Sequence, residues 1–184
     1  MPFVNTKRRK EMNVQRITLT AVCIAIVAVL VSSIPVPNPT TGGFTHPGAI
    51  AEVFIALAFG PVVGGIAAAV GAAIADLALG YGSFAPLTFL AHGSLGLLTG
   101  YLGWKKGMNG MIIGWVVGGL ALVAIYFLGE ATVYGFGVAG ATAELLPNLF
   151  QVGLGILGLG LYQLVKRAYP QIDSLGGSQS FTER

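Results

Sequence analysis

Three polar side chains share one face of the last apolar segment of the chain. Glu144, Asn148 and Gln151 are spaced i, i+4 and i+7, and Pro147 is expected to bend a helix beside them. One carboxylate and two amides supply hydrogen-bond acceptors and donors, but no nucleophile paired with a base. The pattern therefore favours binding of a small polar ligand, although neighbouring helices could satisfy the same groups.

Ionisable groups in other apolar segments are further candidates, because a charge at the bilayer centre costs at least ~2.5–3.5 kcal/mol. Glu52 and Asp76 are such groups. A helix–helix hydrogen bond is the alternative for Glu52, and a polar anchor at a segment end is the alternative for Asp76. Both acids are predicted to contribute to substrate binding.

His92 lies in an apolar segment, with Thr88 four residues earlier on the same helical face. We expect both side chains to contribute to the binding site, although a buried histidine with satisfied hydrogen bonds is the alternative. No second histidine or cysteine stands at a metal-ligand spacing from His92. The sequence therefore predicts no metal site.

Aromatic residues gather at the level of these polar groups. They could belong to the belt that many membrane proteins have at the bilayer interface. They could also form the walls of a mostly apolar pocket with a few fixed polar groups, suited to a flat heterocycle. The residues concerned are Phe44, Tyr81, Phe84, Tyr126 and Tyr134.

Motifs for soluble chemistry are missing from the sequence. It contains no nucleotide-binding loop, no nucleophile–base pair, no paired catalytic carboxylates and no repeated filter motif. We therefore expect no enzymatic activity and no cofactor bound by this chain. Any energy source must lie in another protein.

The composition indicates how these residues are held. Of 184 residues, 54% are hydrophobic and only 9% are charged, and 28 glycines allow helices to approach closely in lipid. This predicts an all-α integral protein of the plasma membrane, with lipid as its outer solvent. The single cysteine, Cys23, permits no disulfide within the chain. Basic residues occur in short blocks beside apolar runs, so a nucleic-acid partner is not expected.

Six transmembrane helices are predicted between a basic segment, 1–16, and a polar tail, 170–184, expected to be disordered. The second apolar run has only 12 residues and could be tilted, broken or re-entrant. Prolines and glycines in 35–48 predict a loop without regular structure, and a glycine-rich connection is expected over 129–141. The predicted spans, which form one membrane domain over 17–169, are 17–34, 48–59, 62–79, 87–104, 111–128 and 142–169.

The Lys and Arg residues support this topology. With six spans and the N-terminus inside, all of them fall in cytoplasmic segments. If 48–79 crossed only once, Lys105 and Lys106 would face outward while Lys166 and Arg167 stayed inside. Both termini are therefore predicted to be cytoplasmic.

Four segments in order resemble a known family. GAIAEVFIALAFGP, AIADLALGYGSFAPLTFLAHG, YFLGE and ELLPNLFQVGLG resemble the substrate-binding S component of energy-coupling factor (ECF) vitamin transporters, in the riboflavin/hydroxymethylpyrimidine-type branch. The resemblance covers residues 17–168.

This resemblance implies a six-helix protein that captures a vitamin or precursor at its outer face. It would then dock on a transmembrane coupling protein driven by two ATPase subunits, which hydrolyse ATP. In such proteins an Ala-xxx-Ala pattern in the first helix contacts the coupling protein, and Ala21, Ala25 and Ala28 supply it here. Packing inside the bundle is the alternative for this strip.

The sequence also departs from the branch. An acidic residue is often found near the position of Ala49, whereas the acid here is Glu52, and a lysine and a glutamate are often found where this chain has His92 and Leu95. These exchanges alter which polar groups a pocket can satisfy. Riboflavin, hydroxymethylpyrimidine, pyridoxine and pantothenate therefore all stay open as substrates. A self-contained ion-coupled carrier or small channel, or a scaffold protein, are the competing functions.

Overall fold

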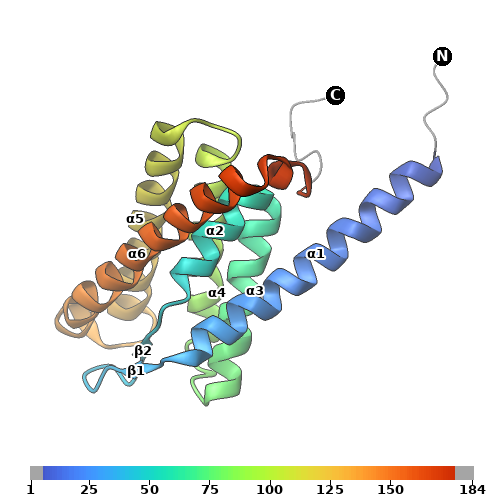
Figure 1. Cartoon of the computed structure of the whole chain (residues 1–184). Helices are drawn as coiled ribbons and strands as arrows, with labels where there is room; N and C mark the ends of the chain where they lie inside the picture. The colour runs from blue at the N-terminus through green and yellow to red at the C-terminus, as the bar shows by residue number, and fades with distance from the viewer. Residues whose placement is uncertain (1–5, 177–184) are drawn as a thin grey trace.

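Six α-helices make up most of the computed structural model, which describes residues 6–176, with side chains from residue 14 onward. The helices form one bundle, from which the first part of α1 projects (Figure 1). This confirms the predicted all-α fold. Residues 1–5 and 177–184, at the ends of the predicted basic segment and tail, lie outside the described residues. The helices are α1 Thr6–Ser33, α2 Ala49–Phe59, α3 Pro61–Leu79, α4 Ala85–Gly103, α5 Met108–Thr132 and α6 Gly137–Ala168.

Four of the described helices are long and apolar enough to cross a membrane: α1 over Val14–Ser33, α3, α5 and α6. The other two are α2, which has only 11 residues, and α4, whose polar residues include Thr88 and His92. α2 is unbroken and packs against α3, α4 and α6, so protein rather than lipid surrounds most of its length. The number of crossings and the sidedness of the termini stay predictions.

The turn between α2 and α3 is built from glycine and proline, as the sequence predicts. Gly60 adopts a φ of 87°, which favours glycine, and Pro61 begins α3, where its missing N–H is not needed. A Cβ atom at Gly64 would lie 2.6 Å from the Cα atom of Ala56. Only glycine at position 64 therefore allows α2 and α3 to approach so closely.

Three expectations about the connecting segments are wrong. Residues 35–48 do contain regular structure, because β1 Val36–Pro37 pairs antiparallel with β2 Phe44–Thr45. Asn38 closes this hairpin by donating its N–H to the Gly43 carbonyl at 2.8 Å and accepting the Gly42 N–H at 2.9 Å. The glycine-rich connection is also shorter than expected, since only 133–136 separate α5 from α6. Helical backbone satisfies its own polar groups in lipid, which outweighs the low helix propensity of glycine.

The third wrong expectation concerns the tail, whose first part is ordered. Pro170–Ser174 forms a 3-10 helix, η1, and Ile172 is buried against the bundle. Asp173 accepts hydrogen bonds from Tyr162 at 2.8 Å and Lys166 at 2.7 Å, both on α6. These contacts explain why a polar sequence after Pro170 folds back instead of leaving the bundle.

The bundle has two distinct ends (Figure 1). One, called the terminal end here, carries the start of α1, the α2–α3 and α4–α5 turns, and η1. The opposite one, called the pocket end, carries the β1–β2 hairpin and the α3–α4 and α5–α6 turns.

Candidate binding site

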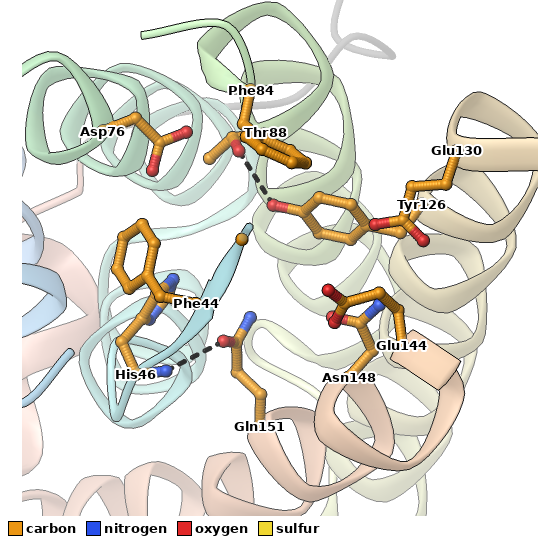
Figure 2. Close-up of a pocket in the computed structure, with 11 residues that line it drawn as sticks. Phe44, His46, Asp76, Phe84, Thr88, Tyr126, Glu130, Glu144, Asn148 and Gln151 are labelled. Atoms are coloured by element: carbon orange, nitrogen blue, oxygen red, sulfur yellow. Dashed lines mark hydrogen bonds between the residues drawn. The ribbon is translucent and has the colours of Figure 1, made fainter. Parts of the chain in front are cut away.

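A small cavity lies at the pocket end, where α3, α4, α5 and α6 meet the segment that follows the β1–β2 turn (Figure 2). Its volume is about 20 Å³, room for about one water molecule. Acidic, amide and aromatic side chains surround it. The lining residues are Gly43, Phe44, His46, Asp76, Phe84, Thr88, Tyr126, Glu130, Glu144, Asn148 and Gln151.

Most of the residues predicted to form the site line this cavity together. They come from separate helices, with Asp76 on α3, Thr88 on α4 and Tyr126 on α5. α6 supplies a whole face, because its i, i+4, i+7 spacing directs the same side of the helix inward. The predicted residues at the cavity are Asp76, Phe84, Thr88, Tyr126, Glu144, Asn148 and Gln151.

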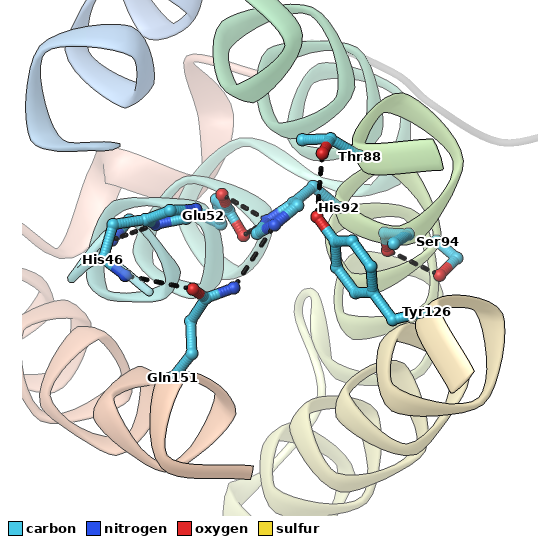
Figure 3. A network of polar contacts seen from close by, with 9 residues as sticks. His46, Glu52, Thr88, His92, Ser94, Tyr126 and Gln151 are labelled. Carbon is cyan, nitrogen blue, oxygen red and sulfur yellow. Dashed lines mark hydrogen bonds and ion pairs between the residues drawn. The ribbon is translucent and has the colours of Figure 1, made fainter. Parts of the chain in front are cut away.

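Glu52 and His92 lie behind the cavity wall in a buried hydrogen-bond network (Figure 3). His92 Nδ1 lies 2.8 Å and 2.9 Å from the two carboxylate oxygens of Glu52. The Gln151 amide lies 3.3 Å from His92 Nε2, and Gln151 Oε1 accepts the backbone N–H of His46 at 3.1 Å. Both residues are fully buried and do not line the cavity. Glu52 contacts His92, and His92 contacts Gln151.

The network also fixes the tautomer of His92. A backbone N–H can only donate, so Gln151 Oε1 faces His46 and the NH₂ group of Gln151 faces His92. His92 Nε2 then accepts, and Nδ1 carries the proton that is donated to Glu52. The imidazole of His92 thus links Glu52 on α2 to the Gln151 amide at the cavity wall.

The turn of the β1–β2 hairpin and the segment after the hairpin are each hydrogen-bonded to α6. One hydrogen bond joins His46 to Gln151, and the other runs from the Thr41 hydroxyl to the Glu144 carboxylate. The Gly43 N–H donates to Thr41 Oγ1 at 3.2 Å and keeps that hydroxyl in place. These two hydrogen bonds hold the hairpin and the segment after it against α6.

Aromatic side chains form the remaining walls. Phe44 and Tyr81 have ring centroids 4.4 Å apart, so Tyr81 contacts Phe44 but does not itself reach the cavity. Phe84 stacks on Tyr134 at 5.3 Å, and the Tyr134 hydroxyl donates to the Ser83 carbonyl at 2.7 Å. On the other side, the Tyr126 and Thr88 hydroxyls are 2.9 Å apart. These contacts hold Phe44 and Phe84 as rigid apolar surfaces.

Two lining side chains were missed from the sequence, those of His46 and Glu130. Glu130 lies in a segment expected to be a loop, yet it follows Tyr126 by four residues, the helical spacing that would have placed both on one face. His46 lies in the proline-rich segment and is 4% exposed. Burial lowers the pKa of His46 well below its ordinary value, so its imidazole is neutral.

The structure places the alanine strip of α1 away from the bundle interior. Ala21 and Ala25 are exposed and Ala28 is half-buried, whereas Cys23, Val27 and Val31 face the core. Ala21 and Ala25 therefore do not pack inside the bundle in this structure, and their contact with a coupling protein stays a prediction. Within the described part of the chain, no group of three His, Cys, Asp or Glu side chains is arranged to hold a metal ion.

A family model described as ECF-type riboflavin transporter, S component, matches residues 11–167. The chain belongs to this family of ECF S components. Such proteins are membrane-embedded, substrate-binding subunits of vitamin transporters and are not enzymes. They work with a transmembrane coupling protein and ATPases. The match to the family model confirms the resemblance found in the sequence.

The architecture agrees with this assignment. A solved structure described as the S component of a bacterial ECF transporter superposes with a TM-score of 0.68, covering 85% of this chain and 98% of that one. At 20% sequence identity, this likeness supports the fold of the ECF S component and not its ligand. Curated protein sequences give no match.

Proposed function

We propose that this ECF S component captures a small water-soluble vitamin or vitamin precursor at its outer face and delivers it through an ATP-driven coupling module. The cavity at the pocket end is the observation that supports this. There, amides, acids and aromatic rings from four helices converge on one point, as in small-molecule sites generally.

The cavity must enlarge before a vitamin can enter. Its volume of about 20 Å³ is far below the roughly 300–1,000 Å³ of typical ligand pockets. The β1–β2 hairpin and the segment after it cover the cavity through Thr41 and His46, whose α6 partners Glu144 and Gln151 are polar groups a ligand can engage. Binding is therefore expected to exchange these internal hydrogen bonds for bonds to the substrate.

The charge distribution supports an outward-facing pocket. The described basic residues Arg16, Lys105, Lys106, Lys166 and Arg167 are grouped on the segments of the terminal end, and such residues collect on the cytoplasmic side. Cysteine labelling in intact cells tests this. Thr40→Cys, on the exposed hairpin, should react with an impermeant maleimide, whereas the exposed Lys105→Cys should not; the reverse pattern contradicts the orientation.

Coupling is assigned to the exposed alanines of α1. Ala21 and Ala25 leave a shallow strip on a helix that is otherwise lined by bulky side chains such as Val22 and Ile26. Small residues four apart let another helix approach closely. We propose that Ala21, Ala25 and Ala28 contact the coupling protein, while the partner ATPases hydrolyse ATP and this chain binds no cofactor.

Reconstitution in liposomes tests the proposed function. Uptake of a bound vitamin should require both ATP and the coupling module, and the S component alone should bind without concentrating it. Uphill uptake by the purified chain under a proton gradient alone would instead establish a self-contained ion-coupled carrier.

A further inference from the structure

Two buried carboxylates at the cavity each have an oxygen without a partner. Asp76 on α3 and Glu130 on α5 are both 2% exposed. Among the described residues, Asp76 Oδ2 and Glu130 Oε2 accept no hydrogen bond. Figure 2 shows the two side chains on different sides of the cavity, separated by Phe84, Thr88 and Tyr126.

This arrangement is unusual because buried polar atoms are nearly always paired. A buried acceptor without a donor loses its hydration and gains nothing in return, which destabilises the folded chain. The acids nearby avoid this loss, since Glu52 pairs with His92 and Glu144 with Thr41. The unpaired oxygens of Asp76 and Glu130 are therefore best explained by a ligand that supplies donors.

The cavity also carries an excess of acidic groups. Asp76, Glu130 and Glu144 line it, and Glu52 lies just behind. The only basic side chain among the described lining residues is the neutral imidazole of His46, since no lysine or arginine is present there. An anionic ligand would bring only further acceptor oxygens to this cluster, with no lysine or arginine among the described lining residues to compensate its charge, and an unpaired charge in a desolvated site strongly disfavours binding.

On the basis of the proposed function, we infer that the site takes an uncharged or cationic heteroaromatic ligand and rejects its phosphorylated or carboxylated counterparts. N–H or O–H donors at two separate points of the ligand would bind Asp76 and Glu130. Phe44 and Phe84 supply flat apolar surfaces for the ring. The unpaired oxygens of these two acids thus determine which form of a vitamin is accepted.

A competition experiment with matched pairs tests this inference. The purified chain is incubated with an equimolar mixture of thiamine, pyridoxine, riboflavin and hydroxymethylpyrimidine, the phosphate ester of each, and pantothenate and biotin. Mass spectrometry then identifies the retained compound. We expect one unphosphorylated, uncarboxylated vitamin, preferred over its phosphate by at least about tenfold.

The outcomes separate the two proposals. Retention of a phosphate ester or a carboxylate overturns the inference and leaves substrate capture standing. Retention of none of these compounds contradicts substrate capture by this chain and, with it, the inference.

Two pocket variants examine the acids directly. Glu130→Gln and Asp76→Asn each replace a carboxyl oxygen by an amide NH₂ group, which can donate a hydrogen bond to a phosphate, and should shrink the preference for the free vitamin over its phosphate by about tenfold. Asp173→Asn, at the terminal end, is the matched control and should leave the preference unchanged. If one pocket variant does not fold, the other still tests the role of the acids. An unchanged preference in a folded pocket variant overturns the inference.

Discussion

The pocket end and the terminal end of the bundle use the same kinds of side chain in opposite ways. At the terminal end, Asp173 receives hydrogen bonds from Tyr162 and Lys166 and fixes η1 against α6. At the pocket end, Asp76 and Glu130 each keep a buried oxygen without a partner among the described residues. For these three carboxyl groups, pairing of the oxygens, rather than the mere presence of an acid in a membrane bundle, separates a structural role from availability to a ligand.

The largest expected effect separates coupling from binding. Ala25→Leu should abolish ATP-dependent uptake in the reconstituted transporter, because the larger side chain holds the partner helix away. Ligand affinity should change less than about twofold, a few tenths of a kcal/mol, since Ala25 lies on the outside of α1 and does not line the cavity. Uptake and calorimetric binding are measured on the same preparation.

Ala124→Leu is the control for this variant, because Ala124 is an exposed alanine on α5. It should leave both uptake and affinity unchanged. A loss of affinity in Ala25→Leu that matches its loss of uptake would show that α1 shapes the pocket instead of docking the partner.

The next effect compares the stability of the two ends. Asp173→Asn breaks a satisfied cluster and should lower the free energy of unfolding by about 1 kcal/mol. Glu130→Gln removes an unpaired buried carboxylate and should raise stability without ligand by a similar amount. Each change corresponds to roughly 2–4 °C in the midpoint of thermal unfolding in detergent. Equal destabilisation by both substitutions would remove the distinction between the ends.

The smallest effect concerns pH. The pKa of His46 is lowered from its ordinary value of 6.5, so the folded chain binds fewer protons than the unfolded chain below that pH. The contribution of neutral His46 is complete above pH 6.5 and is lost progressively as the pH falls from there toward the lowered pKa of the folded state. The unfolding midpoint should therefore drop on acidification from about pH 7.5 to about pH 5.5.

His46→Asn is the informative comparison, because an amide oxygen can still accept the Gly48 N–H that His46 Nδ1 accepts at 3.2 Å. This variant should show a smaller drop over the same interval. An identical drop would assign the pH dependence to the other buried groups, including the His92–Glu52 pair.

Much of the site could be predicted because helical periodicity is local. Glu144, Asn148 and Gln151 had to share a face once α6 was a helix, and all three line the cavity. The interfaces between helices are not local, so the sequence could not show that His92 would contact Glu52 and Gln151 instead of the ligand space. Their predicted roles in binding stay predictions.

The missed features share a physical cause, which is that tertiary contacts override local propensity. Glycines near Glu130 suggested a loop, but the helical backbone continues to Thr132. The tail sequence is polar, yet Lys166 and Tyr162 provide partners for Asp173 that only the folded bundle brings within reach. His46 was overlooked because it lies in a proline-rich segment that was expected to be an irregular loop, whereas its backbone N–H is bound by Gln151 on α6.

Titration calorimetry on two leucine variants of α6 tests the central claim most directly. Asn148 lines the cavity, whereas Gln163 lies about four turns toward the terminal end, where its amide contacts Met111 at 3.2 Å. Asn148→Leu should leave ligand polar groups unpaired and cost about 1–3 kcal/mol, or roughly tenfold to more than a hundredfold in affinity. Gln163→Leu should change affinity little. Equal affinities in the two variants would contradict a binding site at the pocket end.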